Sequence, residues 1–221
     1  MLHYIYGSDL ENFPKLRDTM FRDRAAQFSQ RLAWDSVSVD ARGYETDEYD
    51  AMNPIYIIWE LPDGTHGGSM RMMPTVGKTM LNDHFRNLTD GVHIQSPLIW
   101  ECTRFCISPR ADRRATAALV VAAGELMDEF ALEHFVGVFF DKMERVFALS
   151  AIVPDVLGVS EETDAAGDRI AVGTWEITPA CMARNLRRIG VSRETSKAWF
   201  HASFNRNLPP MTAEIEFKQC A

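Results

Sequence analysis

A glutamate and an arginine lie within one short segment whose other residues favour a buried strand. Residues 100–107 read WECTRFCI, rich in aromatic and β-branched side chains, and the segment stops at Ser108-Pro109. Burying one ionised group without a partner costs several kcal/mol, so Glu101 and Arg104 need partners if they lie inside the protein. Groups of this kind can hold a small charged ligand, or they can form an ordinary salt bridge on a solvent-exposed sheet face.

The spacing of these two residues sets a geometric condition. Strict alternation along a strand would put Glu101 and Arg104 on opposite faces of the sheet. If both serve one pocket, the strand needs a β-bulge between them, and bulges are common beside active sites.

Two further arginines stand where apolar residues are expected. Arg24 falls inside the apolar stripe of a predicted helix over residues 14–32, between Met20 and Phe28. Arg71 lies in a predicted strand amid methionines, in the string GSMRMMPT. Such arginines suggest a pocket for an anion or a polar ligand; the alternative is a side chain that extends along the surface to reach water.

Residues 33–54 are acidic and show no sustained periodicity. An irregular segment of this length inside a compact domain is usually either functional or mobile. With Trp34 near its start and Asp47 and Asp50 near its end, it could form a lid over a cationic ligand, or its carboxylates could simply be solvated. Arginines, carboxylates and aromatics in front of an apolar strand and helix suit a small zwitterion that meets an apolar partner.

The remaining pattern predicts the elements that position these residues. Strands alternate with helices, which gives an α/β fold, an α+β mixed sheet covered by helices, as a single domain over residues 1–221. Strands are predicted at 2–6, 55–61, 67–73, 100–107, 135–140 and 169–177, helices at 14–32, 81–85, 115–132, 142–152, 178–189 and 196–204, and a loop at 158–167.

Composition excludes several classes of function. The net charge of −8 over 221 residues, without a sustained basic stripe, argues against general nucleic-acid binding. The cysteines form no CxxC pair and have no nearby histidine at zinc spacing, so we expect no metal site; Cys102 and Cys106 are expected on one face of a strand, as reduced thiols. No signal peptide and no apolar run of bilayer length is present, so we expect a cytoplasmic protein without membrane contact, a monomer or weak homodimer.

Several motifs occur together in an order that is specific to one family. They are Arg24-x-x-x-Phe28, Trp34 in LAWD, Asp47 and Asp50 in ETDEYDA, Arg71 in GSMRMMPT, Phe85 in LNDHF, and Trp100-Glu101-x-Thr103-Arg104-Phe105. In these residues the chain resembles the acyl-homoserine lactone synthases, the autoinducer synthases of bacterial quorum sensing. Order and spacing agree along residues 1 to about 145.

The resemblance implies a fold and a reaction. The fold would be a GNAT-like three-layer sandwich with a V-shaped cleft between the strands at Trp100 and Phe135. In the reaction, S-adenosylmethionine is N-acylated by an acyl thioester and cyclises to the lactone, releasing methylthioadenosine. The two substrates would be the only small molecules required, with acyl carrier protein or acyl-CoA as the acyl donor.

The resemblance also implies roles for individual residues. Glu101 would be the general base, directly or through a water, and Arg104 would act beside it. An apolar tunnel behind the two strands would take the acyl chain, although apolar residues at such positions are more often plain core. The implied S-adenosylmethionine contacts are Arg24, Phe28, Trp34, Asp47, Asp50, Arg71 and Arg104, and the expected tunnel lining is Met80, Phe105, Leu119, Met127, Phe139 and Phe140.

Two features bear on the acyl group and its donor. Family members that prefer 3-oxo chains tend to carry threonine on the strand where this chain has Phe139-Phe140, which favours an unsubstituted or unusual short-to-medium chain. Basic residues that could dock an acidic carrier protein, or simply be solvated, are Arg110, Arg113, Arg114, Lys142, Arg145, Arg184 and Arg187.

Two rival functions fit the same residues. A different GNAT-type N-acyltransferase would turn over without releasing methylthioadenosine. A non-catalytic S-adenosylmethionine-binding domain would bind the ligand and give no product.

Overall fold

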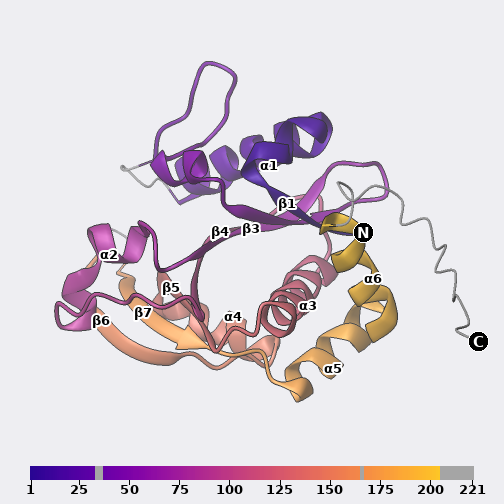
Figure 1. The fold of residues 1–221 in the computed structure, drawn as a ribbon. Coiled ribbons are helices and arrows are strands. Elements are labelled where there is room, and N and C mark those ends of the chain that lie inside the picture. The colour runs from indigo at the N-terminus through magenta and orange to yellow at the C-terminus, as the bar shows by residue number, and fades with distance from the viewer. Residues whose placement is uncertain (33–36, 165–166, 205–221) are drawn as a thin grey trace, which may run out of the picture.

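A mixed seven-stranded sheet in the strand order β1-β2-β3-β4-β5-β7-β6 forms the centre of the protein, with helices on both faces (Figure 1). The computed structural model describes residues 1–32, 37–164 and 167–204. Every neighbouring pair of strands is antiparallel except β4 and β5, which are parallel. This arrangement confirms the predicted mixed α/β fold.

The element bounds agree with most of the predicted ranges. The strands are β1 (Leu2–Tyr6), β2 (Ile55–Glu60), β3 (His66–Pro74), β4 (Ile99–Ile107), β5 (His134–Phe140), β6 (Asp155–Thr163) and β7 (Arg169–Trp175). The helices are α1 (Pro14–Arg24), α2 (Met80–His84), α3 (Arg114–Glu129), α4 (Glu144–Leu149), α5 (Pro179–Ile189) and α6 (Arg193–Phe204). Short 3-10 segments are η1 (Gly7–Asn12), η3 (Glu48–Met52), η4 (Arg86–Thr89) and η5 (Asp141–Met143), and η2 (Ala25–Arg31) is a π-helical continuation of α1.

The strands β4 and β5 touch only at their beginnings. Residues 99–101 of β4 pair with residues 134–136 of β5, and beyond this point no pairing continues. The two halves of the sheet diverge from this contact (Figure 1). The expected V-shaped opening between the central strands is therefore present.

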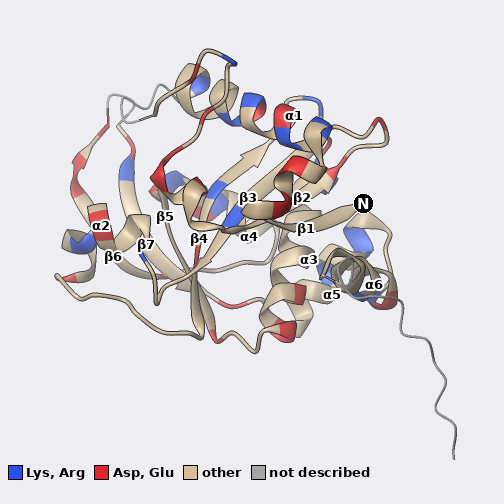
Figure 2. Cartoon of the chain, turned by 45° about the horizontal axis from the view of Figure 1, so that its top comes forward, with Lys and Arg blue, Asp and Glu red and all other residues tan. Residues whose placement is uncertain are grey.

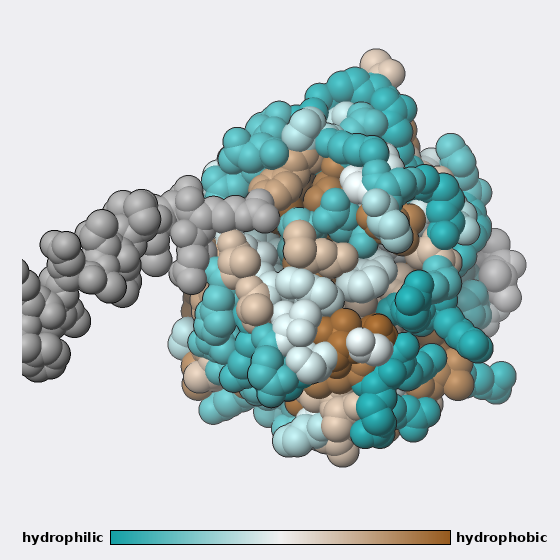
Figure 3. Space-filling view, turned by 90° about the vertical axis from the view of Figure 1, so that its right-hand side faces the viewer, coloured by the Kyte–Doolittle hydropathy of each residue, from teal (hydrophilic) through white to brown (hydrophobic). Residues whose placement is uncertain are grey.

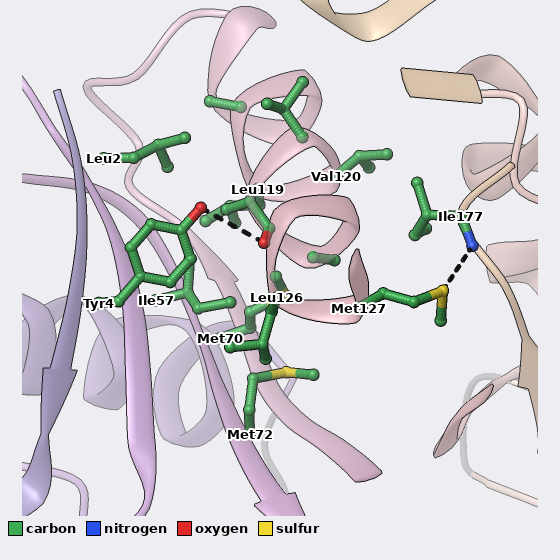
Figure 4. Packing of buried hydrophobic residues seen from close by; sticks show 14 of the residues in the cluster. Leu2, Tyr4, Ile57, Met70, Met72, Leu119, Val120, Leu126, Met127 and Ile177 are labelled. Atoms are coloured by element: carbon green, nitrogen blue, oxygen red, sulfur yellow. Dashed lines mark hydrogen bonds between the residues drawn. The ribbon is translucent and has the colours of Figure 1, made fainter. Parts of the chain in front are cut away.

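The larger core lies between the sheet and α3. Side chains from β1, β2 and β3 meet Leu119 and Leu126 of α3, and the Tyr4 hydroxyl donates to the carbonyl of Ala122 at 3.4 Å (Figure 4). Helix α3 is alanine-rich because α5 packs closely on its other side: a Cβ at Gly124 would lie 2.1 Å from the Met182 sulfur. Helix α1 packs on the opposite face of the sheet, and the two helix layers and the sheet form a three-layer sandwich.

The face that carries α6 and the N-terminus has a mixed surface, with hydrophobic side chains exposed among hydrophilic ones (Figure 3). No helix in the described ranges is long and apolar enough to cross a bilayer.

The bulge that the sequence requires is present in β4. Ser69 pairs with Cys106 and Arg71 with Thr103, so two steps along β3 oppose three along β4. The extra residue is accommodated at Arg104, whose φ of 52° is left-handed, an uncommon conformation for a residue other than glycine. The bulge brings Arg104 to the face of the sheet that also carries Thr103.

The same bulge overturns the expectation for the two cysteines of β4. One inserted residue shifts the alternation of every later side chain to the other face. Cys102 therefore faces α3, whereas Cys106 is buried on the α1 side, near Asp23 and Arg24. Both are free thiols.

One further prediction was wrong in detail. Residues 158–163 belong to β6 rather than to a loop, because an exposed edge strand with polar residues on both faces shows no hydrophobic alternation. The first long helix begins without a side-chain cap: its N-cap is Phe13, which makes no capping hydrogen bond, and Pro14 occupies the first turn.

Candidate active site

Three arginines and three carboxylates form a closed ring of ion pairs between α1, residues 45–50, β3 and β4. Charged residues gather where α1 meets the centre of the sheet (Figure 2). Each arginine contacts two of the carboxylates, and each carboxylate contacts two of the arginines. In order around this ion-pair ring, the members are Arg24, Glu45, Arg104, Asp47, Arg71 and Asp50.

Glu45 joins two of the arginines. Arg24 Nε donates to Glu45 Oε2 at 2.6 Å, and Arg104 Nε donates to Glu45 Oε1 at 3.1 Å. Arg24 also binds Asp50 with both terminal nitrogens, each at 3.0 Å. A two-pronged contact of this kind fixes the orientation of both groups.

Arg71 closes the other half of the ring. Its Nη2 donates to Asp47 Oδ2 at 2.9 Å, its Nη1 contacts Asp47 and lies 2.9 Å from Asp50 Oδ1, and its Nε donates to Thr103 at 3.0 Å. Arg104 Nη2 is 2.7 Å from Asp47 Oδ2. The carboxylates of Asp47 and Asp50 are thus each held between two guanidinium groups.

The ring is buried, and its charges balance. The side chains of Arg24, Arg71 and Glu45 are at most 1% exposed. Burial alone would raise the pKa of Asp50, but the charges of Arg24 and Arg71 outweigh it, so that pKa is lowered well below its ordinary value. The carboxylates likewise outweigh the burial of Arg24 and raise its pKa. Arg24 and Asp50 are therefore ionised at neutral pH.

Local sequence holds the two aspartates in place. Asp47 is the N-cap of η3 and accepts from the backbone N–H groups of Tyr49 and Asp50, while Asp50 accepts from the N–H of Asp47 at 2.8 Å. This is a reciprocal capping box. The same two carboxylates therefore end an irregular segment and bind the arginines.

Glu45 is the ring member that the sequence pattern did not indicate. It is fully buried, and its N–H donates to the Phe21 carbonyl of α1 at 3.2 Å. The sequence did offer one signal for it: Glu45 lies two residues before Asp47, and residues i and i+2 of an extended segment point to the same side.

Arg104 differs from the other two arginines in one nitrogen. Its Nη1 has Met80 Sδ at 3.9 Å as its partner, and among the described residues it is the one guanidinium nitrogen of the ring without an oxygen acceptor. The guanidinium carbon lies 5.5 Å from the centre of the buried Phe28 ring, which comes from the π-helical segment η2. Such π-helical turns are frequent at functional sites.

Glu101 stands next to the ring but outside it. Its carboxylate, 1% exposed, accepts from the backbone N–H groups of Leu81 at 2.6 Å and Met80 at 3.1 Å, at the start of α2. Burial raises the pKa of Glu101 to about 7, outweighing these two hydrogen bonds and the charge of Arg71. The group can therefore exchange a proton near neutral pH.

A separate chain of hydrogen bonds fastens α1 to β3. His66 Nδ1 lies 2.7 Å from Asp23, its Nε2 lies 2.9 Å from Ser69, and its backbone N–H donates to Thr19 at 3.0 Å. Burial lowers the pKa of His66, so its imidazole stays neutral at pH 7. Since His66 and Ser69 are completely buried, we assign them to the positioning of α1, and with it of Arg24.

An apolar cavity of about 50 Å³ lies on the other face of β4, under α3 and α4. Of the six residues expected to line an acyl tunnel, Phe105 and Leu119 line it; Phe139 packs behind two of its aromatic residues, and Met127 contacts the backbone of Ile177 (Figure 4). The remaining lining includes Met70, Met72, Cys102, Thr116, Val120, Phe135, Val146, Phe147, Ser150, Ile152, Trp175 and Ile177.

The structure brings most of the predicted binding residues together. Five of them, Arg24, Asp47, Asp50, Arg71 and Arg104, are in the ring, and Phe28 lies against Arg104. Trp34 lies outside the described residues. Met80 and Phe140 are not among the cavity residues: Met80 lies on the ring side of the sheet, at Glu101 and Arg104. Within the described ranges, no group of His, Cys, Asp and Glu could hold a metal ion.

Comparison with known proteins gives a consistent result. A family profile described as autoinducer synthase matches residues 9–152. A curated acyl-homoserine-lactone synthase of Rhizobium etli is 36% identical over 195 residues, which cover 85% of this chain and 89% of the relative.

Solved structures resemble this chain in fold. The CoA-dependent acyl-homoserine lactone synthase BjaI, solved with SAM and isopentyl-CoA, has a TM-score of 0.75 at 22% identity and covers 86% of this chain and 90% of its own. An acyl-CoA N-acyltransferase from Pseudomonas aeruginosa reaches a TM-score of 0.50 at 12% identity, over 79% of this chain and 98% of its own. The GNAT-like architecture is thereby confirmed.

The ring predicts a specific loss of stability. Glu45→Gln removes one negative charge and leaves Arg24 and Arg104 with an uncompensated buried positive charge. We expect the free energy of unfolding to fall by about 3–5 kcal/mol, measured by urea denaturation. Asp112→Asn, which removes the partner of the exposed Arg114, serves as the control and should change it far less. Equal effects of the two substitutions would contradict a closed ring.

Proposed function

Since the chain belongs to the autoinducer synthase family, we propose that it is an acyl-homoserine lactone synthase. It transfers an acyl group from a thioester to the amine of S-adenosylmethionine, closes the lactone and releases methylthioadenosine. The observation that supports this most is that the buried Glu101, with a pKa of about 7, and Nη1 of Arg104, which has no oxygen partner among the described residues, both contact Met80.

Glu101 acts as the general base of the acyl transfer. The amine of S-adenosylmethionine is protonated in water and must lose a proton before its lone pair can attack the thioester carbonyl. A base is most effective when its pKa lies near the working pH, which suits the raised pKa of Glu101. The C–N bond forms as the C–S bond of the thioester breaks, and the departing thiolate takes up a proton to leave as the thiol.

Arg104 orients the substrate carboxylate through Nη1. In the second step a carboxylate oxygen attacks the carbon that bears the sulfonium, and the C–S bond breaks to release methylthioadenosine. This step needs the carboxylate to be held close to that carbon, which is a positioning task. A charge-assisted hydrogen bond from Nη1 provides it, while Nε and Nη2 of Arg104 stay on Glu45 and Asp47.

The other binding residues act in two ways. Arg24 and Arg71 have every guanidinium nitrogen on an oxygen of the protein, so they brace Arg104 through the ring instead of touching the substrate. Asp47 and Asp50 act through the same ring. Phe28 offers an aromatic face for the adenine or the sulfonium. The same role for Trp34 stays a prediction.

The acyl chain enters the cavity on the α3 side of β4. Cys102, the neighbour of Glu101 along the strand, lines that cavity, so a thioester in the V-shaped opening can have its carbonyl near Glu101 and its chain among apolar side chains. The donor is acyl-CoA or acyl carrier protein. Of the basic residues considered for carrier docking, Arg110, Arg114 and Lys142 are already paired with aspartates.

Three expectations from the sequence stay predictions. They are a single domain over residues 1–221, a cytoplasmic location, and a monomer or weak homodimer.

The reaction is tested with the purified protein. S-adenosylmethionine is supplied with a range of acyl-CoA and acyl-carrier thioesters, and products are identified by mass spectrometry. We expect an N-acyl-homoserine lactone and methylthioadenosine in equal amounts. An acylated amine without methylthioadenosine would identify a different N-acyltransferase, and binding without any product would identify a binding domain; either result would overturn the proposal.

The role of Glu101 predicts a pH dependence. The protonated carboxyl cannot accept a proton, so kcat/KM should rise with pH through about 7 and level off above it. Glu101→Gln should lower kcat by roughly 100- to 10,000-fold and abolish this acid limb while S-adenosylmethionine still binds, measured from methylthioadenosine release. Wild-type turnover in the variant at saturating substrates would refute the assignment.

A further inference from the structure

One wall of the apolar cavity is thin. Helix α4 has six residues, none of them buried, and Leu149 on its outer side is 65% exposed. The wall is completed from inside by Phe147, which lines the cavity together with Val146 of the same helix. A helix with so little buried surface contributes few packing contacts of its own.

Phe147 packs this helix against the sheet. Its ring centre lies 5.2 Å from that of Phe139 in β5 and 6.1 Å from that of Trp175 in β7, and Phe139 and Trp175 are 6.4 Å apart. These are favourable spacings for aromatic pairs. Phe147 and Trp175 face the cavity and Phe139 supports both from behind. Aromatic side chains therefore bound the cavity on the side of α4.

The volume of the cavity limits what it can take. Its volume is about 50 Å³, roughly a third of the 150 Å³ of an engineered cavity that binds benzene. Without movement of the wall, this space suits only a few carbon atoms beyond the thioester carbonyl. Protein interiors are close-packed, so a longer chain has to displace a side chain. The cavity residues Val146 and Phe147 belong to α4, which has no buried residue, and Phe147 has the larger side chain of the two.

We infer that Phe147 sets the acyl chain length, and that this protein uses short acyl groups of about four to six carbons. The inference rests on the proposed function and specifies its acyl substrate. A short chain fills the space between β4 and α3 and ends against Phe147 and Trp175. A longer one meets the aromatic wall, and its thioester carbonyl is pushed away from Glu101.

The test compares acyl-CoA thioesters of increasing length with S-adenosylmethionine, using methylthioadenosine release as the readout. For the wild type, we expect kcat/KM for decanoyl-CoA to be at least about tenfold below that for butyryl- or hexanoyl-CoA. Phe147→Ala should raise the decanoyl-to-butyryl ratio by about tenfold or more. Phe147→Leu, which keeps an apolar anchor for α4, should shift the ratio in the same direction by a smaller amount.

Leu149→Ala is the matched control, because Leu149 belongs to the same helix but is not a cavity residue. It should leave the chain-length ratio unchanged. Equal use of butyryl- and decanoyl-CoA by the wild type, or an unchanged ratio in both Phe147 variants, would overturn this inference alone. Absence of methylthioadenosine with every donor would overturn the proposed function and this inference together.

Discussion

The rest of the structure depends on the closure of the ion-pair ring. Buried charges are unfavourable unless each is paired and hydrogen-bonded. Removing one partner leaves the other as an uncompensated buried charge, which destabilises the fold. In this protein the three guanidinium groups and three carboxylates satisfy one another in a single cycle. The cycle joins α1, residues 45–50, β3 and β4, so these elements must keep their relative positions for any of the charges to be accommodated.

Closure also determines what is left for chemistry. Within the described part of the chain, every guanidinium nitrogen of the ring contacts an oxygen except Nη1 of Arg104, which lies at Met80, at the start of α2, where Glu101 is held. The bulge in β4 is the reason that these two groups share a face. On the other side of the same strand, Cys102 and Phe105 line the apolar cavity. One strand thus separates a polar site from an apolar one, which suits the joining of a zwitterion to an acyl chain.

The sequence predicted most elements and the unusual burial of Arg24 and Arg71, since local periodicity reports which face a residue occupies. The spacing of Glu101 and Arg104 also indicated that a bulge is needed if both serve one pocket. The sequence did not reveal Glu45 as a ring member, because an isolated carboxylate in an irregular segment has no periodic context. Met80 was expected in the acyl tunnel by its position in the chain, but the turn at Thr79 places it beside Glu101. The closing of the ring depends on contacts between segments far apart in the chain, which local pattern cannot report.

The most direct test of the ion-pair ring and its role asks which arginine binds the substrate carboxylate. Dissociation constants for S-adenosylmethionine and for its decarboxylated analogue would be measured by calorimetry with the wild type, Arg104→Lys and Arg24→Lys. If Nη1 of Arg104 alone reaches the carboxylate, the wild type and Arg24→Lys should prefer S-adenosylmethionine by about tenfold or more, and Arg104→Lys should lose that preference. Loss of the preference in Arg24→Lys, with Arg104→Lys unaffected, would contradict the account.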